Sequence, residues 1–355
     1  MTIMSQPAPH HTQWRPVAIV MLLSMLGATL GACTWGGGRN DHPAETPPHM
    51  VWPEPPDQAR IELVSVFGTA ADLGITRSIW ARLASLITGS GDLRMARPVG
   101  VAAAGSRIAV ADPEAALVHV YDVSQHRALA LTTCGDATLA EPVAVAFLDD
   151  RLYVSDALGG CIYVFTSDGG CEGRWSLEDG SRPAGLAADA ERARLYVADT
   201  GAHQVLGFDR QGHNLLRIGH RGTAVGAFNY PTWLALDATG NLYVTDALNF
   251  RVQIFDPTGT PLAQFGMHGD GSGQLARPNG IGVDRDGHVY LVDALFDAVQ
   301  LFDSEGHYLM VFGSRGNAPG QFWLPAGLAI SGERIYVADA YNQRIQVFRI
   351  LRGPS

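Results

Sequence analysis

Six aspartates recur along the chain, each closing a short apolar run such as Leu195-Tyr-Val-Ala-Asp199. A carboxylate of this kind can ligate a metal, transfer a proton or accept amide hydrogens from its own turn. The six residues are Asp112, Asp156, Asp199, Asp246, Asp293 and Asp339. Because the same residue type stands at the same place in every repeat, we predict that these side chains hold Asx-type turns rather than a substrate or a metal.

A second recurrent position precedes six prolines that are 41 to 48 residues apart. It is occupied in turn by Arg97, Glu141, Arg182, Tyr230, Arg277 and Leu324. If the repeats form a ring, three guanidinium groups alternate around its centre, where they can hold a carboxylate, a phosphate or an acidic sugar. The alternative is that the arginines pair with local acids at the surface, where such pairs contribute little.

Two positions after each proline, five repeats carry a small residue and the fourth carries an indole. The residues are Gly100, Ala144, Gly185, Trp233, Gly280 and Gly327. At the mouth of a pocket, Trp233 can stack on a sugar or an aromatic ligand, with Tyr230, Thr232 and Asn279 beside it. The alternative is that the indole simply fills the channel.

The turns that follow the aspartates are more apolar than solvent-facing turns usually are. They contain Leu158, Leu248, Leu295, Phe296 and Tyr341. Such a set can form a rim that docks a protein, and the alternative is packing between neighbouring turns. The turn after Asp199 instead carries His203, which we include among the candidate binding residues.

Composition excludes several classes of function. All 25 basic residues are arginine, so Schiff-base chemistry and a lysine base are excluded. The 35 acidic residues give the chain a net charge of −10, which argues against nucleic acid as a partner.

Three cysteines follow the N-terminal segment, namely Cys134, Cys161 and Cys171. Because their number is odd, either one of them stays unpaired or none pairs. Their spacing matches no structural zinc site.

These positions all belong to one repeat, whose units contain short alternating runs such as Val252-Gln-Ile-Phe-Asp256. Runs of this length, separated by Gly- and Asp-rich turns, predict four antiparallel strands per unit, the blade of a β-propeller. The recurring Phe-Gly, Pro-Gly-Val-Ala and Tyr-Val-Ala-Asp motifs resemble the NHL repeat over roughly residues 61–350. We therefore predict an all-β, six-bladed β-propeller of four-stranded antiparallel blades, closed by an N-terminal strand.

The sixth unit ends at Phe348 without a fourth strand of its own. Residues 61–67, Ile-Glu-Leu-Val-Ser-Val-Phe, have the pattern of that strand, so we predict that they pair with residues 345–348 and close the ring. Between this strand and the first blade, residues 76–88 have apolar side chains at helical spacing and predict a helical insert. Residues 351–355 are a short tail.

The first 32 residues have the features of an export signal. Arg15 precedes an apolar run that is too short for a stop-transfer helix. The four residues that end at Cys33, Leu-Gly-Ala-Cys, resemble the lipobox of bacterial lipoproteins, which implies cleavage before Cys33 and its lipid modification. The alternatives are an ordinary signal peptide and a retained anchor helix. Residues 33–60 are rich in Pro and Gly and predict a tether.

Resemblance to two enzyme families suggests metal chemistry. The peptidyl-hydroxyglycine amidating lyases are similar propellers that hold zinc with three histidines, and His203 resembles one such position. The matching loops carry Phe250 and Gln343, while His220 and His268 lie in outer links, so the ligand set is incomplete. Lactonase-like propellers use a calcium ringed by Glu, Asn and Asp, whereas the inner runs here are mainly Gly, Ala, Val and Leu.

We therefore expect a binding or scaffold lipoprotein that presents one propeller face to a protein or glycan partner in the cell envelope. It is expected to be exported, monomeric and lipid-anchored to a bacterial membrane, facing the periplasm or the outer surface. No cofactor, bound metal or catalytic residue is expected. The alternative is a metal-dependent hydrolase or lyase, amidating-lyase-like or lactonase-like, that acts at the channel mouth.

Overall fold

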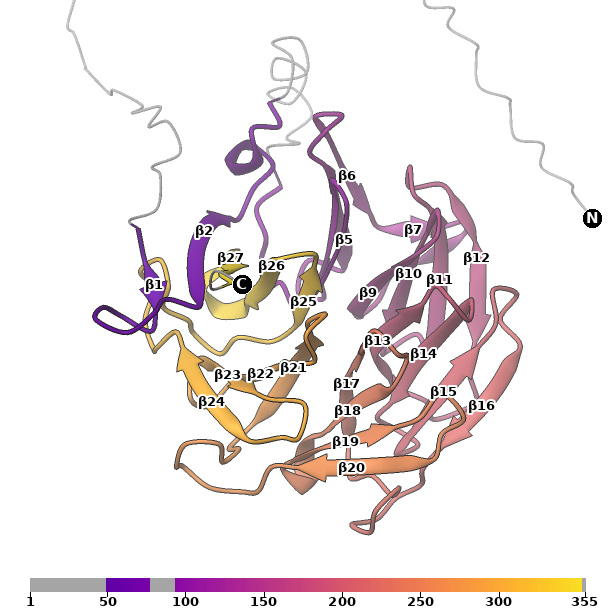
Figure 1. Ribbon diagram of the computed structural model, residues 1–355. Coiled ribbons are helices and arrows are strands. Elements are labelled where there is room, and N and C mark those ends of the chain that lie inside the picture. The colour runs from indigo at the N-terminus through magenta and orange to yellow at the C-terminus, as the bar shows by residue number, and fades with distance from the viewer. Residues whose placement is uncertain (1–48, 77–92, 353–355) are drawn as a thin grey trace, which may run out of the picture. The chain divides into compact units, whose positions relative to one another are not determined.

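The structure is a computed structural model that describes residues 49–76 and 93–352. Its strands form five sheets of four strands, one sheet of five strands and a two-stranded hairpin. Figure 1 shows the six larger sheets as blades arranged around a common centre. The predicted all-β, six-bladed propeller is therefore confirmed. No helix within the described ranges is long and apolar enough to cross a membrane.

Several predicted features lie outside the described residues. They are the signal peptide (1–32), the lipid-modified Cys33, the tether as far as residue 48, residues 77–88 of the helical insert and residues 353–355 of the tail.

The first three blades follow one another along the chain, and each is built from four consecutive antiparallel strands. Blade one contains β3 (Gly100–Ala104), β4 (Arg107–Asp112), β5 (Leu117–Asp122) and β6 (Arg127–Leu131). Blade two contains β9 (Pro142–Leu148), β10 (Arg151–Asp156), β11 (Cys161–Thr166) and β12 (Cys171–Ser176). Blade three contains β13 (Pro183–Asp189), β14 (Arg194–Asp199), β15 (Gln204–Phe208) and β16 (Asn214–Ile218).

Blades four and five repeat this order, and blade six completes it with strands from both ends of the domain. Blade four contains β17 (Pro231–Leu236), β18 (Leu242–Asp246), β19 (Arg251–Phe255) and β20 (Pro261–Phe265). Blade five contains β21 (Pro278–Val283), β22 (Val289–Asp293), β23 (Ala298–Phe302) and β24 (Tyr308–Phe312). Blade six contains β25 (Leu328–Ser331), β26 (Arg334–Asp339), β27 (Arg344–Ile350), β2 (Ile61–Phe67) and β1 (Val51–Trp52). The described residues also form three short 3-10 helices, η1 (Ala71–Leu73), η2 (Ala247–Asn249) and η3 (Ala340–Asn342).

The first strand of each blade lines the centre of the ring. The strands β3, β9, β13, β17, β21 and β25 contact one another in this order, and β25 contacts β3. A Cβ atom added at Gly185 would lie 2.5 Å from the carbonyl oxygen of Thr232 on the next blade, and one at Gly280 would lie 2.5 Å from that of Ala326. Small residues two positions after the prolines therefore allow neighbouring inner strands to approach closely.

The second strands of the blades are buried along nearly their whole length. Their sequences, such as Leu-Tyr-Val-Thr in β18, are apolar at successive positions because neighbouring blades pack on both faces of each sheet. The fourth strands lie at the outside of the ring (Figure 1), and β20 is exposed at most of its positions.

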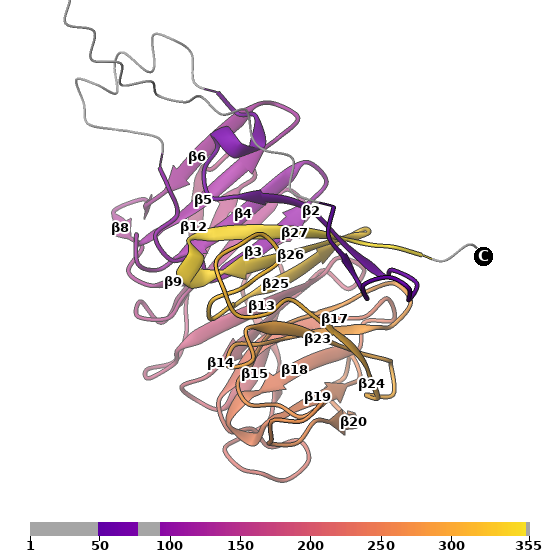
Figure 2. The same ribbon diagram turned by 90° about the vertical axis from the view of Figure 1, so that its left-hand side faces the viewer.

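The N-terminal strand closes the ring as predicted. Strand β2 pairs antiparallel with β27, from Ile61 opposite Ile350 to Phe67 opposite Ile345, and Figure 2 shows the two strands side by side. The ring of Phe67 reaches blade one, where its centre lies 6.0 Å from that of Tyr121. Blade six is therefore sealed against blade one by a residue from the start of the domain.

The predicted tether extends to residue 60, but its last part is folded onto blade six. Strand β1 pairs with β2, with Val51 opposite Glu62. The indole of Trp52 lies 5.8 Å from the ring of Phe348 and 6.0 Å from that of Phe312, between ring centres. These aromatic contacts hold Trp52, which precedes several prolines, against the outer part of the ring.

A short hairpin of β7 (Thr133–Cys134) and β8 (Ala137–Thr138) lies between blades one and two. A disulfide joins Cys134 in this hairpin to Cys171 in the outer strand β12. Cys161 is buried and unpaired. This pairing settles which of the three cysteines is left over.

We expect Cys171→Ser to lower the free energy of unfolding by about 3 kcal/mol, because the disulfide constrains the unfolded chain across a separation of 37 residues. Denaturant unfolding with and without a reductant measures this loss. Cys134→Ser should lose the same amount, and neither variant should respond to reductant. A reductant effect that survives in both variants would contradict the pairing.

Candidate functional site

A cavity of about 310 Å³ opens at one end of the central channel, and we call it the channel mouth. Six of the seven predicted binding residues line it, namely Arg97, Arg182, Tyr230, Trp233, Arg277 and Asn279. Its wall also contains Ala157, Thr200 and Ala294 from the turns between second and third strands. The residues before the prolines and these turns therefore share one face of the propeller, the mouth face.

The recurrent aspartates build this face. Asp199 accepts the amide hydrogen of Ala202 in its own turn at 3.2 Å, and also that of Arg182 at 2.9 Å. Asp293 accepts the amide hydrogens of Leu295 and Arg277 in the same way, at 3.1 and 3.0 Å. Asp112 and Asp156 accept amide hydrogens from their own turns as well, so the predicted Asx-type role is confirmed for these four aspartates. Asp246 and Asp339 instead accept from the side-chain amides of Asn249 and Asn342 in their turns. Asp112, Asp199 and Asp293 also fix the backbone of the mouth-lining arginines.

In blade one the equivalent carboxylate, Asp112, is fully buried. Burial alone would raise the pKa of Asp112, but a hydrogen bond from His119 and those from three backbone amides hold it below its ordinary value. One of these amides belongs to Arg97, at 3.0 Å. Asp112 therefore remains ionised and acts as an anchor for the loop that carries Arg97.

The three arginines differ in their partners. Arg182 forms an ion pair with Glu141 across 3.0 Å, and the Nε atom of Arg97 lies 3.5 Å from Glu114. No carboxylate lies within 4.0 Å of the Arg277 guanidinium among the described residues. Pairing with local acids therefore describes two of the arginines, and the third remains available to a ligand.

Trp233 forms the floor of the mouth. Its side chain is 8% exposed, and its Nε1 atom donates a hydrogen bond to Oδ1 of Asn279 at 3.3 Å. The residue also lines the cavity at the opposite end of the channel, together with Leu234 and Leu328. The indole therefore divides the channel, so the mouth is a shallow pocket rather than the entrance to a pore.

His203 does not line the mouth. Its Nδ1 atom accepts the backbone amide hydrogen of Tyr230 at 3.1 Å, and the two rings meet edge to face at 6.5 Å. Tyr230 has a φ of 67°, a conformation that a non-glycine residue rarely adopts, and the contact with His203 supports it. The structure thus places His203 behind the rim, where it positions Tyr230.

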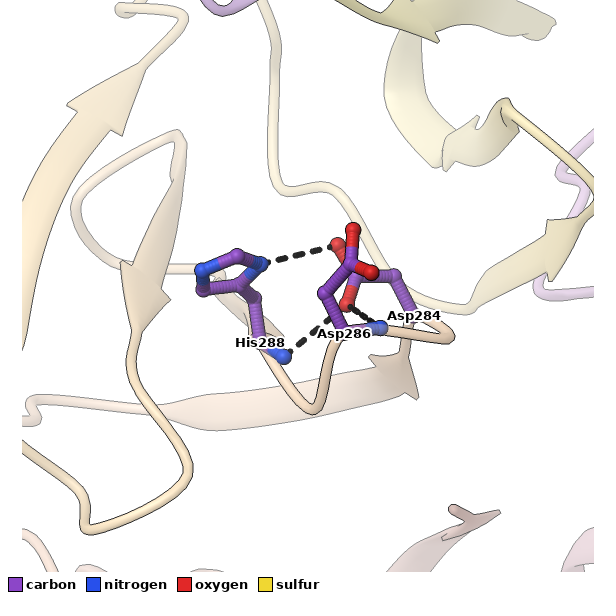
Figure 3. A group of neighbouring side chains, drawn as sticks. All are labelled: Asp284, Asp286 and His288. Atoms are coloured by element: carbon purple, nitrogen blue, oxygen red, sulfur yellow. Dashed lines mark hydrogen bonds and ion pairs between the residues drawn. The ribbon is translucent and has the colours of Figure 1, made fainter. Parts of the chain in front are cut away.

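A possible metal-ligand set lies elsewhere. Among the described residues, only Asp284, Asp286 and His288 bring three ligand atoms within 4.8 Å of one another. Figure 3 shows all three in the turn that joins β21 to β22, where Nδ1 of His288 lies 3.1 Å from Oδ2 of Asp284. The same Asp carboxylate accepts the amide hydrogens of Asp286 and His288, each at 2.9 Å.

This Asp-x-x-Gly-His turn recurs at residues 209–213 and 303–307, each with an Asp–His contact of about 3 Å. Three occurrences indicate a turn-stabilising role for Asp284 and His288 rather than a metal centre. The spacing of Asp, Gly and His was the signal in the sequence that could have revealed these turns.

Sequence reasoning also missed the larger cavity, of about 1000 Å³, where blade five meets the closing strand. Its wall combines Arg60, Arg285 and Arg352 with the apolar side chains of Leu301 and Met310. No single repeat encodes this cavity, because it depends on how the two ends of the domain meet.

Comparison with known proteins supports the repeat and the fold. Residues 228–255 and 322–348 match the NHL repeat. No curated protein matches the chain in sequence.

Several solved structures share the propeller. A catalytically inactive virginiamycin B lyase from Staphylococcus aureus, crystallised with quinupristin, superposes with a TM-score of 0.55 at 14% identity, covering 72% of this chain and 95% of that one. A gluconolactonase from Xanthomonas campestris gives 0.56 at 18% identity, covering 72% and 87%. A protein of unknown function from Bacteroides thetaiotaomicron gives 0.60 at 18% identity, covering 82% and 76%. At these identities the likeness establishes the fold alone.

Proposed function

We propose that this chain is a binding protein of the bacterial cell envelope that holds an anionic group of a protein or glycan partner at the channel mouth. The observation that carries the proposal is the Arg277 guanidinium, which lines the mouth without a carboxylate within 4.0 Å in the described part of the chain. Guanidinium groups hold carboxylates and phosphates through paired, charge-assisted hydrogen bonds.

The surroundings of Arg277 fit a ligand that is only partly enclosed. Asn279 and Tyr230 offer polar groups beside it, and Trp233 closes the pocket from below. A cavity of about 310 Å³ is at the lower end of the range for small-molecule sites, so it suits one sugar ring or one side chain of a larger partner.

The envelope location rests on the N-terminal sequence. Arg15, the apolar run over residues 17–26 and the lipobox-like residues that end at Cys33 support export and a lipid anchor. Lipid chains each contribute about 0.8 kcal/mol per buried methylene to membrane binding. We propose that the protein is a monomer that faces the periplasm or the outer surface.

An array of carboxylated and neutral oligosaccharides, next to acidic and neutral peptides, tests the proposal. We expect binding to the carboxylated or acidic probes, and a loss of roughly tenfold in Arg277→Ala, because a hydrogen bond to a charged group contributes about 1.5 kcal/mol or more. Arg210→Ala is the matched control, since Arg210 lies in the turn after β15 and pairs with Asp149 away from the mouth.

Equal binding by Arg277→Ala and Arg210→Ala would reject the channel mouth as the site. The alternative is a metal-dependent hydrolase or lyase, a class supported by the propeller shared with a lyase and a gluconolactonase. Stoichiometric zinc or calcium in elemental analysis of the purified protein would favour that alternative over the binding proposal.

A further inference from the structure

Exposed apolar side chains gather on the mouth face. Nine large apolar side chains lie exposed in the described parts of its blade-to-blade links and in its turns between second and third strands: Leu93, Leu158, Val225, Tyr230, Leu248, Met267, Leu295, Trp323 and Tyr341. In the described residues, the loops of the opposite face contain none. The two faces of the propeller therefore differ sharply in polarity.

Four of these side chains occupy the same place in their turns, two residues after the recurrent aspartate. Leu158, Leu248, Leu295 and Tyr341 are 68%, 54%, 59% and 48% exposed, respectively. The sequence left open that these residues pack against neighbouring loops. Each of the three leucines is more than half exposed, whereas the ring of Tyr341 lies 5.6 Å from that of Trp323 in the adjacent link. Apolar groups repeated on one face of a protein are typical of a surface that another molecule covers.

Charge divides the mouth face into two halves. The links and turns of blades four to six carry exposed Arg221, Arg277 and Arg315, and their only exposed acid in the described chain is Asp270. The corresponding loops of blades one to three carry the acids Glu114, Asp136, Glu141, Glu178 and Asp179 against the arginines Arg94, Arg97 and Arg182, so acids outnumber basic residues there. Most of the exposed apolar side chains belong to the first of these halves, which we call the docking sector.

We propose that the docking sector binds a protein whose surface presents apolar side chains flanked by carboxylates. This inference rests on the proposed binding function and specifies the partner. Aromatic residues, Met and Arg are the side chains enriched in protein interfaces, and complementary charge selects the partner and speeds its association.

Two other occupants fit less well. A glycan needs hydrogen-bond donors and acceptors, whereas Val225, Leu248, Met267 and Leu295 offer none. A flat anionic bilayer would also meet the acidic half of the same face, which would repel it. A protein can cover blades four to six and leave the acidic half free.

The test uses the full chain in the cells that produce it, with a photo-reactive phenylalanine analogue placed at position 248. The matched control is the same analogue at position 262, because Leu248 and Leu262 are both 54% exposed and both belong to blade four. Leu262 lies on the outer strand β20, outside the docking sector. We expect a discrete protein adduct from position 248 only, in which the cross-linked partner peptide contains Asp or Glu beside apolar residues.

Charge reversal then tests complementarity. Arg221→Glu combined with Arg315→Glu should lower the adduct yield roughly tenfold, since like charges would now face each other. Neither arginine lines the channel mouth, so this loss is separate from any loss of anion binding there. Arg210→Glu, in the turn after β15, should leave the yield unchanged.

An adduct with lipid, glycan or a second copy of this chain would overturn the inference, as would equal adducts from both positions or an adduct indifferent to charge reversal. If position 248 still forms the adduct while the probe array shows no binding, the channel mouth is rejected as a binding site and the docking sector is supported.

Discussion

Asp246→Ala is expected to lower the free energy of unfolding by about 4 kcal/mol, because it leaves a buried guanidinium without its counter-charge. Asp246 is fully buried, and its Oδ2 atom lies 2.8 Å from Nε of Arg251, which is itself only 9% exposed. The other carboxylate oxygen accepts the amide hydrogen of Asn229 at 2.7 Å. Denaturant unfolding of the purified protein measures the loss.

Asp256→Ala provides the control within the same blade. Asp256 also accepts two amide hydrogens, from Thr258 and Thr260, but in an exposed turn without an arginine partner. We expect a much smaller loss for this variant. A loss below about 1 kcal/mol for Asp246→Ala would mean that neighbouring groups replace the carboxylate, and the proposed anchoring of the mouth loops would then be wrong.

The second large effect is expected at the seam between the last and first blades. Phe67→Ala should lower the free energy of unfolding by about 4 kcal/mol, the range measured for removal of a buried aromatic ring. Phe67 is 1% exposed and packs in one cluster with Ile108 and Tyr121 of blade one and Ile345 of blade six. Its loss removes contacts on both sides of the closure.

Glu62→Gln serves as the matched change on the same strand. Glu62 contacts Arg349 at 3.6 Å near the surface, so its charge is expected to contribute less than about 1 kcal/mol. If Phe67→Ala unfolds no more easily than Glu62→Gln, β2 does not seal the ring in solution.

The repeat made most of the fold predictable. Each unit carries its strands, turns and proline in the same order, so a run such as Leu242-Tyr-Val-Thr-Asp246 could be placed from its neighbours. The closing strand was predictable because residues 61–67 have the pattern of a fourth strand, and the sixth unit contains no fourth strand of its own. The fold of β1 was not predictable, since it depends on the contacts of one indole with blade six.

The sequence predicted where the residues of the candidate site lie, but not which partners their side chains contact. Equivalent places in a repeat must return to the same face, which brought Arg97, Arg182 and Arg277 to one cavity. Which acid each arginine meets depends on how far its side chain extends, and the contact of His203 with the amide of Tyr230 depends on unusual positive φ angles at both residues. The spacing of the repeat encodes neither the reach of a side chain nor the φ angle of a single residue.

The pairing of β2 with β27 also sets the order of events during synthesis. The two strands are separated by almost the whole domain, so the first strand must wait, unpartnered, until residues 344–350 have emerged. A chain interrupted before Arg344 would leave β26 and β2 each with an unpaired edge and would be exposed to aggregation and proteolysis. Closure of the ring therefore requires the C-terminal strand, so only a chain synthesised as far as residue 350 can form the closed, stable propeller.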